Sequence, residues 1–314
     1  MASSFKFAPL ATSSSSSAGA KSAARSGVDR LYAMLERGNV VVLTGAGIST
    51  DSGIPDYRSP TGSYSVGHKP MLHSEFVSSE ANRKRYWLRS MFGYGAFQAS
   101  QPNDGHRAIS ELQRRGIVDS VITQNVDRLH QKAGSESVLE IHGHLSSVGC
   151  LSCGANHDRA EYQDLLRTQN AEWVKHHLQL SIDDLDFADI RADGDANIAH
   201  DDLTDFSVPA CSVCKQGVLK PNVVFFGGSL DPSIREAALK RVTEPNVNSL
   251  LVVGSSLSTW SALRLARAAK DQGKDLGILN IGPTRADDIA DFLCPENITK
   301  ALQDAILPLC SSRA

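Results

Sequence analysis

The feature that most constrains the fold is an aliphatic run that leads directly into a glycine-rich turn. Residues 40–44 (VVVLT) are apolar without alternation, which is typical of a parallel strand buried on both faces. The next residues, Gly45-Ala46-Gly47, form a turn in which backbone N–H groups can approach a pyrophosphate. A helix precedes the strand, with apolar residues at helical spacing at Val28, Leu31, Tyr32 and Leu35. A helix, a buried strand and a glycine turn in series predict the start of a dinucleotide-binding α/β unit.

The α/β pattern returns along the chain after two interruptions. We predict helices at 106–115 and 262–271, and strands at 117–123, 138–141, 223–226, 250–253 and 278–281. Residues 54–100 are instead irregular or helical, and 154–210 form an acidic stretch with a helix near 160–166. Because the parallel-strand pattern resumes after residue 214, the second interruption is predicted to be an insertion within the sheet domain.

Four of the six cysteines form two CxxC pairs. They are Cys150, Cys153, Cys211 and Cys214. Without a secretory signal, metal binding is favoured over disulfides, and two CxxC knuckles supply the four thiolates of a tetrahedral zinc site. Such a site has no open coordination position, so its zinc is predicted to be structural. Cys294 and Cys310 lack metal-ligand spacing and are expected to be ordinary buried thiols.

These patterns predict an α/β fold with a Rossmann-like parallel sheet domain and an inserted small zinc-binding domain. The large domain would comprise residues 28–148 and 218–314, and the insertion 149–217, with a helical, flexible lobe at 54–100 belonging to the small domain. Residues 1–27 are rich in Ser and Ala and contain no acidic residue. They are expected to be a disordered leader, and their scattered basic residues are typical of an organelle transit peptide.

Charge and hydropathy exclude two classes of partner. The 314 residues carry a net charge of −3, whereas a nucleic-acid-binding surface requires a basic face. No apolar run approaches the roughly 20 residues that span a membrane. We therefore expect a soluble protein without nucleic-acid or membrane partners, and we expect a monomer.

Polar side chains follow two of the predicted strands. Gln124, Asn125 and Asp127 come after the strand at 117–123, at the edge where open parallel sheets form their ligand crevice. Polar groups buried there are costly unless they bind something. His142 follows the strand at 138–141 and stands beside Gly143. A lone histidine is more often structural, but a neutral imidazole at this edge could also act as a base.

The loop at 53–59 allows two interpretations. Arg58 could hold a phosphate, Tyr57 could cover a ring, and Asp56 could anchor a carboxamide or the turn itself. The alternative is a polar loop with a structural Asp–Arg pair. Thr50 breaks the G-x-G-x-x-G spacing, and no acidic residue closes a strand about 20 residues later. A dinucleotide therefore fits this site, whereas the layout of a hydride-transferring dehydrogenase is absent.

The order of these motifs resembles that of the sirtuins, NAD-dependent protein deacylases, over about residues 28–310. The resemblance rests on the two CxxC pairs and on GAGIS at 45–49, GIPDYR at 53–58, TQNVD at 123–127, HG at 142–143, GSS at 254–256 and NIG at 280–282. Residues 53–59, 85–87, 223–227 and 280–285 further resemble the mitochondrial class II branch, the type numbered fourth in animals. The resemblance implies NAD as co-substrate, one structural zinc ion and a location in the mitochondrial matrix.

The resemblance also implies a reaction and roles for individual residues. In sirtuins the acyl-amide oxygen of a lysine attacks the nicotinamide ribose of NAD, and nicotinamide leaves. His142 would be the general base that activates a ribose hydroxyl, Asn125 would be the second catalytic residue, and the products would be lysine and O-acyl-ADP-ribose. The residues implied in NAD binding are Thr44, Gly45, Ala46, Gly47, Asp56, Tyr57, Arg58, Gln124, Asn125, Asp127, Gly254, Ser255, Ser256, Asn280, Ile281, Gly282 and Ile298.

Further residues are implied in recognition of an acyl-lysine protein substrate. A Tyr-x-x-Arg pair, Tyr86 and Arg89, matches one that reads the acyl carboxylate in a related class II sirtuin, because Arg and Tyr can together donate three hydrogen bonds. This pattern suggests acyl groups other than acetyl, namely lipoyl, biotinyl or acidic branched groups. The substrate groove would include Val223, Phe225 and Gly227. The family usually has an acidic residue at the next position, where this chain has Gly228, so peptide affinity or main-chain pairing with the peptide is expected to differ from that of the family.

Three other functions compete with deacylation. A protein mono-ADP-ribosyltransferase would use the same NAD site with a different acceptor. A zinc-ribbon binding module without catalysis is opposed by the acidic insertion and the net negative charge. A conventional NAD dehydrogenase is opposed by the absence of the acidic residue that would bind the ribose.

Overall fold

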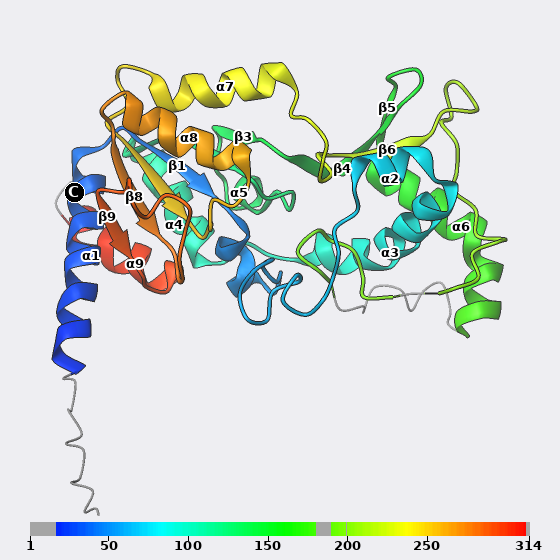
Figure 1. Cartoon of the computed structure of the whole chain (residues 1–314), viewed down its shortest axis with the longest axis horizontal. Helices are drawn as coiled ribbons and strands as arrows, with labels where there is room; N and C mark the ends of the chain where they lie inside the picture. The colour runs from blue at the N-terminus through cyan, green and yellow to red at the C-terminus, as the bar shows by residue number, and fades with distance from the viewer. Residues whose placement is uncertain (1–16, 180–189, 199, 312–314) are drawn as a thin grey trace, which may run out of the picture.

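The computed structural model describes residues 17–179, 190–198 and 200–311, which fold around two β-sheets (Figure 1). The larger sheet has six strands in the order β3-β2-β1-β7-β8-β9, and every neighbouring pair is parallel. The smaller sheet has the antiparallel order β5-β4-β6. Within the described residues, no helix is long and apolar enough to cross a membrane.

The six-stranded sheet is covered by helices on both faces because its strands are apolar on both faces. Val40 and Val42 pack against α1, α4 and α9, whereas Val41 and Leu43 pack against α7 and α8. The strands are β1 (Val40–Thr44), β2 (Val118–Thr123), β3 (Val138–Glu140), β7 (Ser249–Val253), β8 (Asp275–Leu279) and β9 (Phe292–Cys294). The helices are α1 (Ser17–Arg37), α4 (Asp104–Arg114), α7 (Pro232–Thr243), α8 (Trp260–Asp271) and α9 (Ile298–Ser311).

The small sheet has a separate core, dominated by aromatic side chains. Tyr86 and Trp87 pack edge-on to each other, and Tyr86 also meets Phe76 and Phe225. The elements around this core are α2 (His73–Ser78), α3 (Glu80–Ala99), β4 (Gly143–Cys150), β5 (Asn156–Asp158), α6 (Arg159–Leu178) and β6 (Leu219–Val223). The remaining short elements are η1 (Ala46–Ser52) and α5 (Leu129–Lys132), which follow β1 and β2.

The structure confirms the parallel α/β pattern and corrects one strand. Residues 223–226 were expected to form a strand of the parallel sheet, but β6 ends at Val223 and pairs with β4 in the small sheet. The prediction was wrong because four consecutive apolar residues resemble a buried parallel strand. Phe225 is instead buried against Phe76 and Tyr86 of the small domain.

Two helices are longer than predicted. Helix α1 begins at Ser17, before the expected start near Val28, so residues 17–27 are helical and not part of a disordered leader as expected. Helix α6 extends to Leu178, well past the predicted helix at 160–166. Four aspartates of the acidic stretch, Asp183, Asp184, Asp186 and Asp189, lie outside the described residues. We propose that 28–148 with 218–314 and 149–217 with 54–100 are the two domains, although the pairing of β4 with β6 carries the small sheet slightly beyond the insertion at both ends.

The segment Ile141–Gly143 joins the two sheets through its backbone. The N–H of Ile141 donates to the carbonyl of Thr123 at the end of β2, with an N–O distance of 2.9 Å. One residue later, the carbonyl of His142 accepts from the N–H of Val224 at 2.9 Å. Gly143 then begins β4 in the left-handed region, with φ of 76°. A Cβ atom at this position would lie 1.9 Å from the carbonyl oxygen of Asn222.

The four CxxC cysteines gather at one end of the small sheet. The Sγ atoms of Cys150 and Cys214 are 3.7 Å apart, and those of Cys153 and Cys211 are 3.8 Å apart. All four sulfurs lie within 4.8 Å of one another. A zinc–sulfur distance of about 2.3 Å places tetrahedral ligands roughly 3.8 Å apart, so these four residues fit a structural zinc ion.

His157 lies beside the cysteine cluster, whereas the other two cysteines, Cys294 and Cys310, are not part of it. His157 places Nε2 3.3 Å from the sulfur of Cys211, where its N–H can orient a thiolate without being a ligand. Cys294 is buried in the large domain, as expected, and the side chain of Cys310 lies outside the described part of the chain.

Replacing Gly143 with Ala is expected to destabilise the protein. The left-handed backbone and the contact with Asn222 together should cost about 2–5 kcal/mol of unfolding free energy. Gly38→Ala is the matched control, because Gly38 has φ of 71° and nothing lies within 4 Å of the place that its Cβ atom would occupy. Urea unfolding followed by tryptophan fluorescence measures both variants, and equal losses would show that the Asn222 contact is unimportant.

Removing the zinc site is expected to unfold the small domain. Structural zinc contributes roughly 10–16 kcal/mol in isolated fingers, as much as the roughly 5–15 kcal/mol that stabilises a typical protein. Elemental analysis should find one zinc per chain in the wild type and none in Cys150→Ala, whose melting temperature should fall. Cys294→Ala, which removes a buried thiol from the large domain, should retain the metal. A wild-type protein that contains no zinc, and whose melting temperature equals that of Cys150→Ala, would contradict the assignment.

Candidate active site

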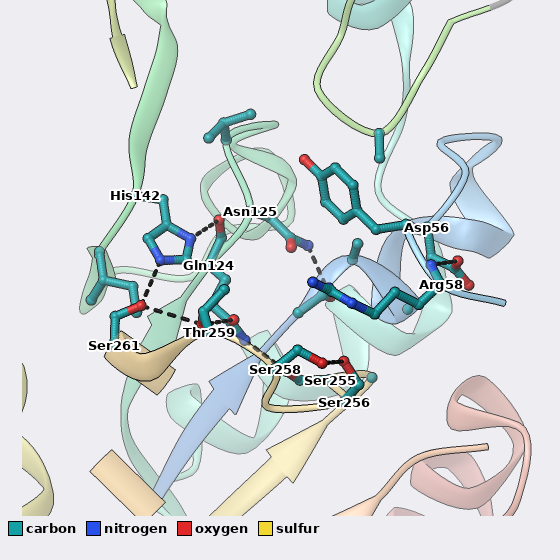
Figure 2. Close-up of a pocket in the computed structure, with 18 of the residues that line it drawn as sticks. Asp56, Arg58, Gln124, Asn125, His142, Ser255, Ser256, Ser258, Thr259 and Ser261 are labelled. Atoms are coloured by element: carbon teal, nitrogen blue, oxygen red, sulfur yellow. Dashed lines mark hydrogen bonds between the residues drawn. The ribbon is translucent and has the colours of Figure 1, made fainter. Parts of the chain in front are cut away.

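A large cavity lies where the parallel strands end and the small domain begins. Its volume is about 1450 Å³, and its wall contains residues from both domains. Of the residues implied by the family resemblance, the wall includes all those for NAD and substrate except Thr44 and Arg89, and it includes His142. Figure 2 shows His142 at one side of this cavity and Asp56 and Arg58 at the other.

The glycine turn after β1 is shaped by close packing against the turn after β7. A Cβ atom on Gly45 or Gly47 would lie 2.7 Å or 2.9 Å from the carbonyl oxygen of Gly254. The N–H of Gly45 donates to Val253 and that of Gly47 to Gly254, at 3.1 Å and 2.9 Å. These two amides were expected to face a phosphate, but here they hold the neighbouring strand end. The main requirement for glycine at these two positions is therefore the close contact between the two turns.

Thr44 lies beneath the cavity floor. Its hydroxyl donates to Thr123 Oγ1 at 2.8 Å and meets Nε2 of His130 at 3.0 Å. The side chain is completely buried. Thr44 therefore supports the ends of β1 and β2 from below, which is why it does not contribute to the cavity wall.

Asn125 and Asp127 are held in place by one serine. Ser49 Oγ accepts from the amide of Asn125 at 3.1 Å and donates to the carboxylate of Asp127 at 2.7 Å. Asn125 also donates to the carbonyl of Gly45 at 3.1 Å. Burial raises the pKa of Asp127, opposed by its bonds from Ser49 and the N–H of Leu129. Both side chains are buried and preorganised at the end of β2.

In the loop after η1, the side chain of Asp56 anchors the turn itself. Its Oδ1 accepts the backbone N–H groups of Arg58 and Ser59 at 2.9 Å and 2.8 Å, so Asp56 fixes the turn. No ion pair joins Asp56 to Arg58 among the described residues. The Arg58 guanidinium instead lies 5.3 Å from the centre of the Tyr64 ring, and the Tyr64 ring meets Tyr57. Within that part of the chain, Arg58 thus has no carboxylate partner.

His142 is hydrogen-bonded through both ring nitrogens. Nδ1 lies 3.1 Å from the carbonyl oxygen of Gln124, and Nε2 lies 2.9 Å from Oγ of Ser261 (Figure 2). Ser261 also reaches Thr259 at 3.3 Å, and Thr259 donates to Oε1 of Gln124 at 3.1 Å. The amide of Gln124 in turn donates to Ser255 at 2.8 Å. A closed hydrogen-bond network therefore connects the imidazole to the ends of β2 and β7.

The electrostatics of this network favour a neutral imidazole. Because a carbonyl can only accept, Nδ1 must carry the hydrogen, which leaves the lone pair on Nε2. Burial lowers the pKa of His142, and the bond to the Gln124 carbonyl opposes this shift. A neutral histidine on the cavity wall, with its lone pair on Nε2, can accept a proton near physiological pH.

The rest of the wall has a polar part around Ser256 and Asn280 and an aromatic part around Tyr86 and Phe225. Ser256 meets Ser258 at 2.9 Å, and the amide of Asn280 donates to the carbonyls of Ile281 and Gly282. The Ile281 side chain is 70% exposed at the edge of this region. Ile298, at the start of α9, is partly buried against the large-domain core and also lines the cavity.

The aromatic recess lies toward the small domain. Val223, Phe225 and Gly227 line it with Tyr86, whose pKa is raised by burial. The guanidinium of Arg89 points elsewhere, since its Nε donates to the carbonyl of Arg85 on the same helix at 3.2 Å. The structure therefore brings Tyr86 to the cavity wall but does not bring Arg89 there with it.

Several wall residues were not identified from the sequence. Ser49, Thr259 and Ser261 belong to the two hydrogen-bond networks, and Arg235 and Arg264 line the cavity from α7 and α8. A usable signal existed for two of them, because Thr259 and Ser261 follow the GSS turn within the serine-rich stretch 254–261. Arg235 and Arg264 gave no signal, since isolated arginines on helices usually face solvent.

Comparison with known proteins agrees with this geometry. A protein named NAD-dependent protein deacylase SIR4 from Monosiga brevicollis is 49% identical over 84% of this chain and 82% of its own length. The bovine NAD-dependent protein lipoamidase sirtuin-4, mitochondrial, is 42% identical over 81% of this chain and 77% of its own length.

Solved structures show the same similarity. One described as the structural basis for the mechanism and regulation of Sir2 enzymes has a TM-score of 0.71 at 30% identity, covering 92% of this chain and all of its own. A Sir2–p53 peptide–NAD⁺ structure has a TM-score of 0.69 at 26% identity, covering 91% and 99% of the two chains. The Sir2 family model matches residues 45–261, from the glycine turn to the serine that contacts His142. The chain therefore belongs to the Sir2 family.

Proposed function

We propose that this chain is an NAD-dependent protein lysine deacylase of the class II branch. The observation that carries the proposal is that His142 and the glycine turn face one cavity whose wall comes from both domains. Relatives at 42–49% identity over most of the chain are named NAD-dependent protein deacylase or lipoamidase. The bovine relative's name also supports a mitochondrial location, and we propose the matrix and a monomeric enzyme.

The cavity fits NAD together with a second ligand. Small-molecule sites typically measure about 300–1,000 Å³, so a cavity of about 1450 Å³ has room for a dinucleotide and an acyl-lysine side chain. Asn125 and Asp127 would bind the nicotinamide half, Arg58 the phosphates, and Ser255, Ser256 and Asn280 the adenosine half. When bound, NAD supplies the ADP-ribose group that accepts the acyl group as nicotinamide is released.

His142 would act as the general base through Nε2. The Gln124 carbonyl fixes the tautomer, and the Ser261 hydroxyl can donate to the neutral Nε2. After Nε2 gains a proton it donates to Ser261, whose hydrogen can turn to Thr259, and Thr259 continues to donate to Gln124. One rotation of a hydroxyl therefore satisfies both protonation states, so the network stabilises the imidazolium without moving the backbone.

The acyl group is proposed to be long and uncharged, with lipoyl as the leading candidate. The recess beside Tyr86 and Phe225 is aromatic, and Arg89 does not line it. The carboxylate of Asp193 does line the cavity, and its charge would repel an acidic acyl group. Biotinyl and acidic branched acyl groups are the alternatives that the same assay tests.

An acyl-lysine panel assayed with NAD tests the reaction and the acyl class together. Lipoyl-lysine peptide should give kcat/KM at least about tenfold above acetyl, because each extra methylene in an apolar pocket contributes ~10-fold or more. His142→Ala should lower kcat by about 10²–10⁴ while the fold and zinc content remain. An acetyl or acidic branched peptide that is preferred over lipoyl would contradict the acyl class, and full turnover by His142→Ala would contradict the base.

The same reactions separate deacylation from mono-ADP-ribosylation. Mass spectrometry should find the acyl group on released ADP-ribose and a free lysine on the peptide. ADP-ribose retained on protein, with the acyl-lysine intact, would instead support the transferase.

The pH dependence of kcat tests the contact between Ser261 and His142. Because burial lowers the pKa of His142, the base stays neutral below pH 6.5, and the acid limb should lie below that value. Ser261→Ala removes a charge-assisted bond to the imidazolium, so the acid limb should move to lower pH and kcat should fall. Ser146→Ala is the control, since its hydroxyl contacts a different histidine, His144. An acid limb that is identical in all three proteins would exclude the role of Ser261.

A further inference from the structure

The arginines and aspartates of the cavity wall differ in whether they have partners within the protein. The wall contains four arginines, Arg58, Arg235, Arg264 and Arg285, and no lysine or glutamate among the described residues. None of the four forms an ion pair with a carboxylate in the described part of the chain. Arg285 is held by donating to the carbonyl of Ser258 at 3.1 Å and by stacking on Trp260 at 4.7 Å. Within residues 17–179, 190–198 and 200–311, four arginines of the cavity wall therefore have no carboxylate within ion-pair distance.

The four aspartates of the same wall are each already engaged within the protein. Asp51 accepts from Thr299 at 2.7 Å, and Asp56 and Asp127 accept backbone and serine donors. Asp193 lies 3.6 Å from Arg191 and accepts the N–H of Asp195. The acids thus have partners inside the fold, whereas the arginines remain available for an anionic ligand.

The arginines divide into two groups by position. Arg58 lies in the loop after η1 and lines the cavity, and the proposed NAD complex gives it the phosphates as an occupant. Arg235 projects from the first turn of α7, Arg264 from α8, and Arg285 covers Trp260 at the start of α8. The α7–α8 rim is defined here as Arg235, Arg264, Arg285 and Trp260. Arg235 and Arg264 have no occupant in the NAD complex as proposed, whereas Arg285, whose backbone N–H donates to Ser256 at 3.1 Å, lies beside the proposed adenosine half.

The exposure of the rim favours an extended peptide over a small anion as its ligand. All three arginines are exposed, and the Trp260 side chain is 60% exposed. A small anion needs a desolvated pocket to bind tightly, whereas a peptide lying across the opening can form several weak contacts at once. The net charge of the chain is −3, so the rim opposes the overall charge rather than repeating it.

We propose that the α7–α8 rim selects protein substrates that carry aspartate or glutamate beside the acyl-lysine. This inference rests on the proposed function, since the acyl-lysine must enter the cavity for its neighbours to cross the rim. Arginine can bind a carboxylate through two parallel N–H donors, and Trp260 offers a flat surface for the intervening peptide. The rim therefore reads the sequence around the lysine, while the aromatic recess reads the acyl group.

Peptide binding without NAD tests the rim independently of turnover. Three fluorescein-labelled lipoyl-lysine peptides, identical except for Glu, Ala or Lys at the flanking positions, are titrated with wild-type protein at low salt. The Glu peptide should bind about threefold to tenfold more tightly than the Ala peptide, as expected for two or three exposed ion pairs. The Lys peptide should bind most weakly, and the differences should shrink at high salt.

Charge reversal provides the decisive comparison. Arg235→Glu/Arg264→Glu should reverse the order of the three peptides. The matched control is Lys175→Glu/Lys240→Glu, which makes the same charge change at two exposed lysines, on α6 and α7, outside the cavity wall. In a parallel assay with NAD, the rim variant should raise KM for the Glu peptide and leave kcat within about twofold.

The remaining outcomes overturn one claim or the other. Equal affinities for the three wild-type peptides, or equal effects of the two double variants, overturn the rim. Competition by inorganic phosphate at millimolar concentration, with no preference among peptides, assigns the arginines to a small anion and also overturns it. Turnover of all peptides without preference preserves the proposed function, whereas failure of every peptide to bind or react overturns the function and the rim together.

Discussion

The backbone pairing of Ile141–Gly143 with both sheets is the constraint on which the rest of the structure depends. Ile141 continues the hydrogen bonding of β2, and the carbonyl of His142 is bonded to Val224 just after β6. The imidazole therefore projects from a segment that neither domain can move alone. Because Gly143 must pass within van der Waals contact of Asn222, the turn from one sheet to the other leaves no room for a side chain. A rigid junction and a fixed base thus have the same physical origin.

The cavity owes its preorganisation to hydrogen bonds made before any ligand arrives. Ser49 positions Asn125 and Asp127, while Gln124 and Ser261 position His142. Groups held this way require little reorganisation when charge develops during the reaction. The arginines of the wall are the exception, because none has a carboxylate partner among the residues that the structure describes. The contrast separates the part of the site that is built for chemistry from the part that is available for recognition.

Much of the large domain could be predicted from the sequence because its signals are local. An unbroken apolar run identifies a strand buried on both faces, and the polar residues after it must lie at the ligand edge of a parallel sheet. That argument alone placed Asn125 and Asp127 in the cavity. The small sheet gave a weaker signal. Residues 143–150 (GHLSSVGC) are mostly small, and their two aliphatic residues do not alternate with polar ones, so β4 was not predicted, and β6 was assigned to the wrong sheet.

The sequence by itself determined the parallel sheet, the four-cysteine set and the strand-end positions of the site, because periodicity and spacing are properties of neighbouring residues. Only the tertiary structure decided which side chains share a cavity. Thr44 lies one residue from the glycine turn yet points into the core, and Arg89 shares a helix with Tyr86 yet does not line the wall. Ser261 comes within 2.9 Å of His142 from 119 positions away. Such contacts arise from the packing of distant segments, and no local pattern encodes them.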